Sequence, residues 1–433
     1  MTVTKKSKKS KDGLPIVVIG GGPAGMTAAQ AAVGIYGNVL LYDKNPFPGK
    51  KLQAVPLETV FMGEKLPPDN MADAFGDKSE FIKPALKAFG WKELQQYLST
   101  MGINISQNGS SHLKADPVDK SDLSSILKNA AENAGVAIRK SCRVTDIVIS
   151  KNSVKGIIVN GIEHPAVAVI VACGSFSSPG RGSTNDGYSL AQRAGHTVNP
   201  IKPALLGLET VEKFGKILSD IDVDKCAVEI QLNGQAQLRD VGQIKFTRFG
   251  LDGELILTHS AKIIEMLNSG KVEIHIDFIP RKNRKDIEEM INEKAQQTNR
   301  ITIGEILKDY LPENLLQAAK KVIRIPHDKP AAHLSNLEKK GMILWLKDFH
   351  FTIRRPRPFS ETKGVLGGVS VDEIDPQTLR SKLIPNLYFA GEVLDLLGPW
   401  GGYNIQMAFA TGYVAGQSAA SELVKKSKKS ATE

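Results

Sequence analysis

Cysteine is scarce in this sequence, with only Cys142, Cys173 and Cys226 among 433 residues and no C-x-x-C pair. This scarcity excludes a disulfide framework and a zinc site built from cysteines, and it favours a reducing, cytoplasmic compartment. The eight histidines also lack a metal-binding spacing, because no two of them lie three or four positions apart and no H-E-x-x-H occurs. We therefore expect no metal ion.

A long apolar run without interruption is missing as well. The stretch 13–42 carries no charge, but the sequence GGGP breaks it in the middle. No other segment is long and apolar enough to span a bilayer. We expect a cytoplasmic protein without a membrane span.

An excess of positive charge is nearly absent from the body of the chain. The net charge is +10, but residues 1–13 hold five Lys and one Asp, and residues 421–433 hold four Lys and two Glu. The hexapeptide KKSKKS occurs at both ends, at 5–10 and at 425–430. Lys/Ser stretches of this kind are usually solvated and disordered, so we expect tails over 1–13 and 425–433 and no nucleic-acid partner.

A glycine-rich turn stands at the front of the chain. Residues 15–19 (PIVVI) predict a buried strand, Gly20–Gly25 match G-x-G-x-x-G, and residues 24–33 predict a helix of small residues. Residues 38–43 predict a second strand that ends in Asp43. This order of strand, turn, helix, strand and acid is typical of dinucleotide-binding proteins.

Each position of this turn has a physical task. Gly20 permits the tight turn, Gly22 lets a pyrophosphate approach the backbone, and Gly25 lets helix and strand pack closely. The N-terminus of the helix faces the phosphates. Asp43 would accept hydrogen bonds from the adenosine ribose, and its charge would repel a 2′-phosphate, so FAD or NAD fits better than NADP.

Two further buried strands end in glycine. They are expected over 167–174 (VAVIVACG) and 386–392 (NLYFAGE), and the second precedes a helix over 403–420. The acid at its end, Glu392, can bind the ribityl hydroxyls of a flavin, and the helix N-terminus would favour the anionic reduced flavin ring. Because no second G-x-G-x-x-G follows a strand, we expect no dedicated NAD(P)H domain.

Longer motifs accompany these elements. They are GKKL (49–52), GSTNDGYSLAQRAGHTV (182–198), KPAL (202–205), FTRFGLDG (246–253), RPF (357–359), GGVSVDEIDPQTLRSKLIPNLYFAGEVLD (367–395) and GGYNIQMAFATGYVAG (401–416). With these motifs the chain resembles, over most of residues 14–420, the flavoprotein family that includes aminoacetone oxidase and a bile-acid 3-dehydro reductase. The sequence departs from the family's pattern at 53–68, where a glycine-rich loop is usual, and at 172–175, where ACGS replaces ATGG.

The resemblance implies a tightly bound FAD, with NAD(P)H as a candidate transient electron donor. It implies that Val144 offers backbone atoms to the adenine, that Gly391 and Glu392 hold the ribityl chain, and that residues 402–404 meet the isoalloxazine ring. The full set of expected cofactor-binding residues is Gly20, Gly22, Pro23, Ala24, Gly25, Asp43, Lys44, Lys51, Val144, Ala172, Cys173, Gly174, Gly391, Glu392, Gly402, Tyr403, Asn404 and Ile405.

The expected fold is α/β, with a Rossmann-like FAD-binding domain of the glutathione-reductase or fumarate-reductase type and an inserted α+β domain. The FAD-binding domain is discontinuous, over 14–195 and 350–424, and the inserted substrate-side domain covers 196–349. Within the insert, strands are expected at 226–232, 236–247, 254–258 and 272–279, and helices at 282–297, 301–310, 313–322 and 335–347.

A flavin supplies the redox chemistry, so the leading hypothesis is an FAD-dependent oxidoreductase that transfers a hydride between flavin N5 and a small organic substrate. The substrate would be an activated C=C or C=O that is reduced, or an amine or C–H that is oxidised. The sequence leaves the direction and the oligomeric state open. Two alternatives are an RNA-binding or RNA-modifying flavoprotein that uses the Lys tails, and an electron-transfer flavoprotein without a small substrate.

The candidate catalytic residues are Arg357, in the RPF motif, and Tyr403. Arg357 could hold a carboxylate or polarise a carbonyl with its bidentate fork, and a structural ion pair is the alternative. Tyr403 could donate a proton or act only through its backbone. Further substrate-side candidates are His350, Arg354, Arg355 and Trp400, whereas Cys173, His196 and His259 are expected to be structural.

Overall fold

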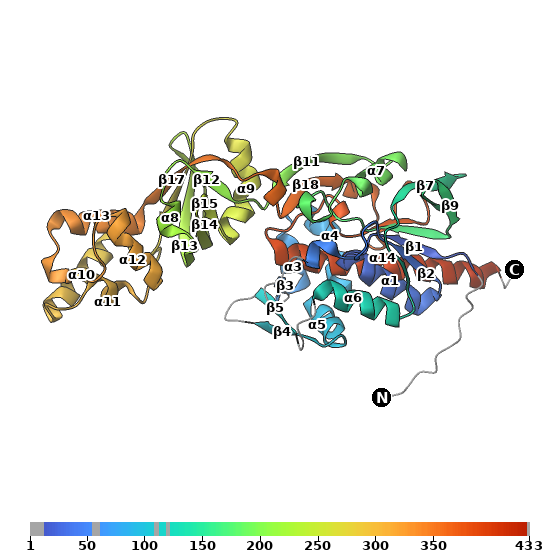
Figure 1. The fold of residues 1–433 in the computed structure, drawn as a ribbon, viewed down its shortest axis with the longest axis horizontal. Coiled ribbons are helices and arrows are strands. Elements are labelled where there is room, and N and C mark those ends of the chain that lie inside the picture. The colour runs from blue at the N-terminus through green and yellow to red at the C-terminus, as the bar shows by residue number, and fades with distance from the viewer. Residues whose placement is uncertain (1–12, 54–60, 108–111, 118–121, 431–433) are drawn as a thin grey trace. The chain divides into compact units, whose positions relative to one another are not determined.

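The computed structural model describes residues 13–53, 61–107, 112–117 and 122–430 (Figure 1). The chain divides into two compact units, of which the second is the continuous segment 203–362 and the first consists of the residues on either side of it. The chain thus leaves the first unit once and returns to it after completing the second. None of the helices in the described ranges combines the length and the apolar character that a membrane span needs.

A five-stranded parallel sheet forms the centre of the first unit. Its order is β6 (Ala137–Arg139), β2 (Val39–Tyr42), β1 (Ile16–Ile19), β10 (Ala168–Val171) and β19 (Leu387–Phe389). The strands β1 and β10 are buried along their whole length, as expected for a parallel sheet that is covered on both faces. Ile19 pairs with Val171 on one side and with Tyr42 on the other, so the central strands end at one common edge.

Two helices from opposite ends of the sequence pack against each other in this unit. They are α1 (Pro23–Tyr36), which follows β1, and α14 (Gly401–Ser430), and Figure 1 shows them side by side. A Cβ at Gly412 would lie 2.2 Å from the Ala24 carbonyl oxygen, and one at Gly416 would lie 2.1 Å from that of Ala28. The two backbones approach so closely that neither position of α14 has room for a side chain.

Smaller elements complete the first unit. In the described ranges, three small sheets have the orders β3-β5-β4, β7-β8-β9 and β11-β18. Their strands are β3 (Phe61–Glu64), β4 (Ile103–Gln107), β5 (His112–Pro117), β7 (Val144–Ser150), β8 (Ser153–Val159), β9 (Ile162–Pro165), β11 (Val198–Ala204) and β18 (Gly364–Val369). The remaining helices are α2 (Lys50–Gln53), α3 (Pro68–Asp73), α4 (Ser79–Ala88), α5 (Trp91–Ser99), α6 (Leu123–Asn133) and α7 (Asp186–Arg193).

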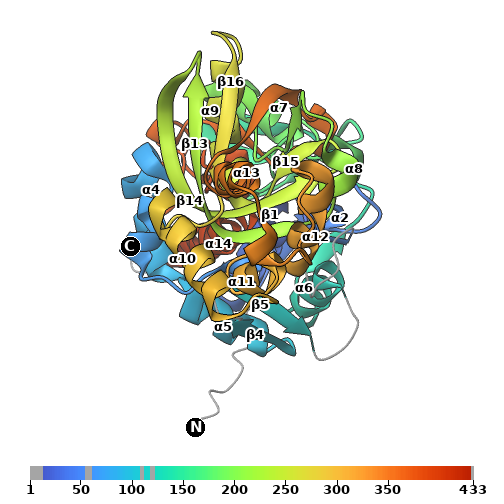
Figure 2. The same ribbon diagram turned by 90° about the vertical axis from the view of Figure 1, so that its left-hand side faces the viewer.

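The second unit is built on a closed β-barrel. Around the barrel the strands are β12 (Leu208–Thr210), β15 (Gly250–Asp252), β14 (Gln235–Thr247), β13 (Asp222–Leu232), β16 (Val272–Asp277) and β17 (Phe349–Pro356). Side chains alternate along these strands, so that Val272, Ile274 and Ile276 of β16 are buried inward while the residues between them face outward. Helices α10 to α13 form one group in this unit (Figure 2). The helices of the unit are α8 (Gly215–Leu218), α9 (Glu254–Met266), α10 (Arg284–Gln297), α11 (Ile303–Leu307), α12 (Glu313–Val322) and α13 (Asn336–Lys347).

The prediction of an α/β fold with a Rossmann-like sheet and an inserted α+β domain is confirmed. Two local expectations are wrong. Residues 254–258, expected as a strand, begin α9, because Leu255, Ile256 and Ile263 recur with helical spacing. Residues 425–430, expected in a disordered tail, continue α14, because lysine is a good helix former. Residues 1–12 and 431–433 lie outside the described residues.

The unit boundaries also differ from the expected ones. The chain changes unit after residues 202 and 362, instead of after residues 195 and 349. Residues 196–202 stay with the first unit because β11 pairs with β18, and residues 350–362 stay with the second because β17 closes the barrel between β16 and β12. Both boundaries are set by pairing between strands far apart in the sequence, which no local pattern reveals.

Candidate functional site

A cavity of about 310 Å³ lies at the edge of the first unit's sheet where β1, β2 and β10 end. Doubly wound sheets bind ligands at this edge, and the volume is in the range of small-molecule sites. Of the predicted cofactor-binding residues, Gly20, Gly22, Pro23, Ala24, Asp43, Lys44, Lys51, Val144, Ala172, Cys173, Gly174, Gly391, Glu392, Asn404 and Ile405 line the cavity, and Gly25, Gly402 and Tyr403 do not.

The glycines of the first turn meet different constraints. Gly20 has a φ of 107°, and a Cβ there would lie 2.3 Å from the Ala172 carbonyl oxygen. A Cβ at Gly25 would lie 1.8 Å from the Gly20 carbonyl oxygen, so Gly25 serves close packing and not the cavity. At Gly22, in contrast, a Cβ would meet no described atom within 4 Å. The open space at Gly22, at the N-terminus of α1, is therefore room for a ligand.

Asp43 connects the glycine turn to the end of β2. Its Oδ2 accepts a hydrogen bond from the Gly21 amide at 2.8 Å, and its Oδ1 accepts one from the Asn45 amide at 2.7 Å. Burial raises the pKa of Asp43, and these hydrogen bonds and the charge of Lys44 oppose the rise. The carboxylate lies in the cavity wall, where the ribose of an adenosine would meet it.

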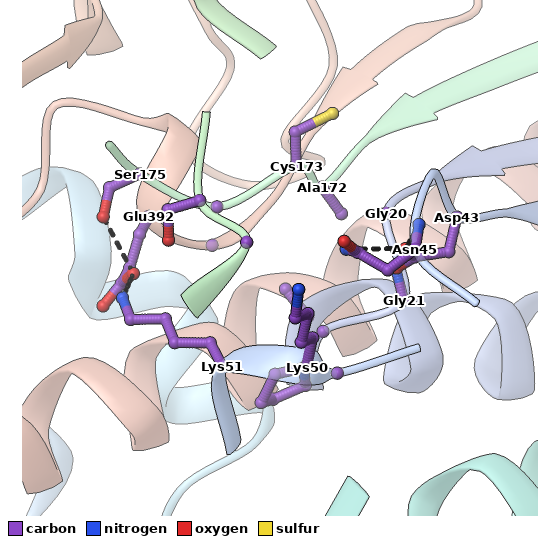
Figure 3. A pocket seen from close by; sticks show the side chains of 18 of the residues that line it. Gly20, Gly21, Asp43, Asn45, Lys50, Lys51, Ala172, Cys173, Ser175 and Glu392 are labelled. Atoms are coloured by element: carbon purple, nitrogen blue, oxygen red, sulfur yellow. Dashed lines mark hydrogen bonds and ion pairs between the residues drawn. The ribbon is translucent and has the colours of Figure 1, made fainter. Parts of the chain in front are cut away.

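Glu392 follows β19 in a single 3-10 turn and is held by two side chains. Its Oε2 lies 2.8 Å from Lys51 Nζ and 3.0 Å from Ser175 Oγ. Figure 3 shows Lys51 and Ser175 converging on this carboxylate from opposite sides. The structure thus brings together Lys51 and Glu392, which the sequence placed in the same site although 341 positions separate them.

A second charged cluster joins β2, β7 and α7 beside the cavity. Lys44 Nζ lies 3.3 Å from Asp186 Oδ2, and Arg143 Nη2 lies 2.6 Å from Asp186 Oδ1. Lys44 also donates to the Thr184 hydroxyl. Burial alone would raise the pKa of Asp186, but the hydrogen bonds from Arg143 and Thr184 and the charge of Lys44 lower it. Asp186 therefore stays ionised and holds two cations at the cavity wall.

Sequence reasoning missed many lining residues. Arg143 and Asp186 are the most important, and Asp186 lies in the motif 182–198, in which the sequence analysis singled out only His196, as a structural residue. The missed lining residues are Ile19, Gly21, Tyr42, Asn45, Gly49, Lys50, Leu52, Cys142, Arg143, Ser175, Ser178, Arg181, Gly182, Ser183, Asp186, Leu190, Lys363, Gly401 and Ala408. In the segment 53–68, which departs from the family pattern, residues 54–60 lie outside the described residues.

Cys173 is a half-buried residue of the cavity lining, and its sulfur lies near Gly187 of α7. Figure 3 shows the sulfur pointing away from Lys51 and Glu392. A Cβ added at Gly187 would lie 2.8 Å from Cys173 Cβ and 3.6 Å from its sulfur. Burial raises the pKa of the Cys173 thiol to about 12. This environment supports the structural role expected for this cysteine.

We therefore expect Cys173 to resist alkylation in the native protein. At pH 8.5, a thiol with a pKa near 12 is ionised in on the order of one molecule in three thousand, and only the thiolate reacts. Mass spectrometry after iodoacetamide treatment should find Cys173 modified only when the protein has been denatured first. Native labelling of Cys173 at the rate found after denaturation would contradict a buried, neutral thiol.

The start of α14 presents its backbone and Asn404 to the cavity, but not its aromatic rings. Asn404 Oδ1 accepts a hydrogen bond from the Gly398 amide at 2.8 Å, and its Nδ2 donates to the Trp400 carbonyl at 3.0 Å. Trp400 and Tyr403 pack edge to face, with ring centroids 5.8 Å apart. Tyr403 lies in the core, so its proposed catalytic role stays a prediction and its position favours packing.

Arg357, the other candidate catalytic residue, lies in the second unit. Its Nη1 is 2.8 Å from Glu209 Oε1, and its Nη2 and Nε are 2.6 Å and 3.0 Å from the two Glu361 carboxylate oxygens. Its guanidinium also lies 3.7 Å from the centroid of the Phe249 ring. The hydrogen bond to Glu361, followed by the charges of both carboxylates, raises the pKa of Arg357. Protein carboxylates occupy its fork, which favours the structural ion pair over a substrate clamp.

Arg357→Lys is expected to lower the free energy of unfolding by roughly 1.5–3 kcal/mol, because an ammonium cannot make the parallel pair of charged hydrogen bonds. Arg355→Lys is the matched control. Arg355 also contacts Glu209, but its side chain is 62% exposed, so its replacement should change little. Denaturant unfolding of both variants measures the difference. A substrate clamp would give the reverse pattern, with turnover lost and stability kept in Arg357→Lys.

Most of the chain also matches a known family. A model of the HI0933-like protein Rossmann domain matches residues 14–418, which include both units. The chain belongs to the HI0933-like family. This membership confirms the resemblance that the motifs indicated, and it extends over the barrel unit as well as over the sheet with the cavity.

Curated relatives of this HI0933-like chain align over nearly its full length. The 3-dehydro-bile acid delta(4,6)-reductase of Clostridium scindens is 30% identical over 414 residues, which cover 94% of this chain and 98% of that protein. The ribosomal RNA dihydrouridine synthase of Haemophilus influenzae is 25% identical over 403 residues, which cover 92% of this chain and 96% of that protein. An Escherichia coli protein of the same name is also 25% identical.

Solved structures share the fold at low sequence identity. The 3-ketosteroid delta1-dehydrogenase of Sterolibacterium denitrificans has a TM-score of 0.55 and 12% identity, with 94% of this chain and 99% of that chain covered. The 3-ketosteroid-delta4-(5alpha)-dehydrogenase of Rhodococcus jostii has a TM-score of 0.51 and 17% identity, with 97% and 98% covered. The family and the fold confirm the prediction of a Rossmann-like FAD-binding fold and of an enzyme of the oxidoreductase class.

The residues of the cavity fit an FAD molecule. The open cradle at Gly22 suits a pyrophosphate, and two carboxylates, Asp43 and Glu392, stand where sugar-alcohol hydroxyls need acceptors. Cations outnumber carboxylates in the lining, as a doubly charged pyrophosphate requires. The lining cations are Lys44, Lys50, Lys51, Arg143, Arg181 and Lys363, and the lining carboxylates are Asp43, Asp186 and Glu392.

Proposed function

We propose that this chain is an FAD-dependent reductase of carbon–carbon double bonds that are conjugated with a carbonyl group, with a small organic molecule as substrate and NAD(P)H as transient electron donor. The observation that carries the proposal is the cavity, in which the open turn at Gly22, Asp43 and Glu392 line one continuous space. The glycine turn, the two carboxylates and the excess of cations in the lining suit a dinucleotide, and the chemistry then follows from the flavin.

The names of the curated relatives support this reaction class. The two double bonds that delta(4,6) denotes, beside a 3-dehydro group, and the double bond that a dihydrouridine synthase saturates are all conjugated with a carbonyl. Such a double bond accepts a hydride at its β-carbon and a proton at its α-carbon. Each cycle would consume one NAD(P)H and one proton and would saturate one double bond.

Bound FAD would supply the hydride chemistry, and the residues of the chain would bind and orient it. The amides at the start of α1 and the open turn at Gly22 would hold the pyrophosphate. Asp43 would accept hydrogen bonds from the ribose, and the Lys51–Glu392 pair would exchange part of its contact for ribityl hydroxyls. The N-terminus of α14, which lines the cavity through Gly401, would favour an electron-rich ring by roughly 0.3–1 kcal/mol.

Anaerobic turnover with defined enones tests the proposal. The purified chain is mixed with NADH or NADPH and with a 3-oxo-Δ4 steroid or cyclohexenone, and Gly22→Val serves as the flavin-free control. The expected result is substrate-dependent oxidation of the nicotinamide together with a product that has gained two hydrogens. A flavin-loaded protein whose reduced flavin passes electrons to none of these enones would contradict the proposal and would favour an electron-transfer flavoprotein.

Ribosomal RNA is the second candidate substrate, because two relatives carry the name ribosomal RNA dihydrouridine synthase. The double bond of a uracil ring has the same conjugation, so the same cavity chemistry would apply. Nucleoside analysis of ribosomal RNA from cells with and without the gene distinguishes the two substrates. Dihydrouridine that disappears on deletion, and returns with the wild-type chain but not with Gly22→Val, would assign the RNA substrate.

A further inference from the structure

The second unit carries a cluster of metal-ligating side chains on the outer face of its barrel. His275 lies on β16 and His350 lies on β17, where the two residues are direct partners in the antiparallel register. Asp348 precedes β17. The two imidazole rings are stacked with their centroids 5.2 Å apart. One ligand atom from each of the three residues lies within 4.8 Å of the other two.

The His275 ring has binding capacity that the described protein atoms do not use. Its Nδ1 lies 2.6 Å from Asp348 Oδ1, while its Nε2 is buried and has no hydrogen-bond partner among the described residues. Because Asp348 faces Nδ1, an ion that binds both Asp348 and His275 would take the place of this hydrogen bond, and Nε2 would carry the proton of the neutral ring.

The charges around the cluster favour a cation. Glu229 of β13 is the register partner of His275 on its other side, and Glu273 lies two positions before His275 on the same outward face of β16. Arg239 pairs with Glu229 and Lys271 pairs with Glu273, so these two carboxylates are partly neutralised. Among the described residues, Asp348 forms an ion pair only with His275, and its charge is therefore available to an ion.

We infer that His275, His350 and Asp348 bind a divalent transition-metal ion, for which Zn²⁺ is the best match. Two imidazoles and one carboxylate form a donor set that zinc accepts, with water as the fourth ligand. Ligand atoms around a tetrahedral zinc lie roughly 3.3 Å apart, given bond lengths of about 2.0–2.1 Å. In this structure the ligand atoms lie within 4.8 Å of one another, so they would approach by up to about 1.5 Å on binding the ion. Mg²⁺ and Ca²⁺ prefer oxygen ligands and should bind more weakly.

The ion would link β16 to the junction of α13 and β17. Asp348 and His350 lie 73 and 75 positions after His275, so an ion bound by all three would connect distant parts of the chain. It would raise the free energy of unfolding by an amount that increases with its affinity. Spacing rules for histidines along one helix or loop cannot detect this cluster, because only the pairing of β16 with β17 brings the two rings together.

Equilibrium dialysis of the full-length, FAD-loaded protein without an affinity tag tests the inference. Dialysis against buffered Zn²⁺, followed by metal analysis, should give one bound ion per chain. His350→Gln and His275→Gln should each weaken binding at least roughly 10-fold. Zn²⁺ should also raise the melting temperature of the wild type but not that of His350→Gln. Because His350 is exposed, its replacement leaves the barrel core intact.

His259→Gln is the matched control. His259 pairs with Asp240 at 2.7 Å in the same unit. Among the described residues, this pair belongs to no group of three metal-ligating side chains. This variant should keep the Zn²⁺ stoichiometry and affinity of the wild type. Less than one ion per chain at saturation, or Zn²⁺ binding that His350→Gln leaves unchanged, would overturn the inference.

Discussion

Gly22→Val is expected to give a folded but colourless protein. Gly22 has a φ of −80° and a ψ of −177°, an extended conformation that valine adopts without strain. A Cβ at this position meets no described atom within 4 Å, so the apoprotein should fold as before. The added side chain would fill the space that a pyrophosphate needs. FAD affinity should fall at least roughly 100-fold, which corresponds to about 2.7 kcal/mol.

The ratio of flavin to protein absorbance after purification measures this effect, and circular dichroism checks the fold. Gly34→Val is the matched control, because Gly34 lies on α1, which Gly22 directly precedes, and also has open space around it, but it does not line the cavity. The control should stay yellow. A Gly22→Val protein that retains a full complement of FAD would remove the basis for the proposed cofactor site.

Gly416→Ala is expected to destabilise the first unit by about 3 kcal/mol or more. The new Cβ would lie 2.1 Å from the Ala28 carbonyl oxygen and 2.8 Å from its carbonyl carbon. Backbone atoms cannot rotate away as a side chain would, so α1 and α14 have to separate. Because α1 also carries Ala24 at the cavity wall, separation should release FAD as well.

Urea unfolding followed by flavin fluorescence measures this change in the first unit specifically. Alanine is a better helix former than glycine by about 1 kcal/mol, which works against the expected loss. Gly34→Ala isolates that term, since a Cβ there meets no described atom within 4 Å and should stabilise the protein slightly. Equal stability of Gly416→Ala and the wild type would show that the two helices are not held at their present distance.

The cofactor-side fold could be predicted because its signals are local. Strand, turn, helix and second strand follow one another within residues 15–43. The apolar pattern of each strand and of the helix, and the glycines between them, are visible in the sequence. The barrel could not be predicted as a barrel, because its closure depends on pairs such as Leu208 with Pro356. Short strands of this kind carry no sequence signal for their partners, so the unit boundaries were misplaced by up to one strand.

The candidate site divides in the same way. Residues at the ends of strands, such as Gly22, Asp43 and Glu392, were found because position after a strand is visible in the sequence. The cluster of Lys44, Arg143 and Asp186 was missed as a unit, because three separate elements contribute it. Residue type alone is a poor guide to catalytic residues. Arg357 pairs with protein carboxylates, and Tyr403 is packed in the core.

Because α1 packs against α14, the cofactor site is complete only after α14 has been synthesised. On the ribosome, the barrel unit emerges as one continuous segment, 203–362, and has all its strands before α14 is made. The first unit emerges in two parts, before and after the barrel unit. The close contact of α1 with Gly412 and Gly416 can therefore form only after α14 has been made. Until then α1 can pack only against earlier elements such as β1, β2 and α6, and the cavity lacks Asn404 and Ile405. FAD should therefore bind only after α14 has been made and has packed on α1.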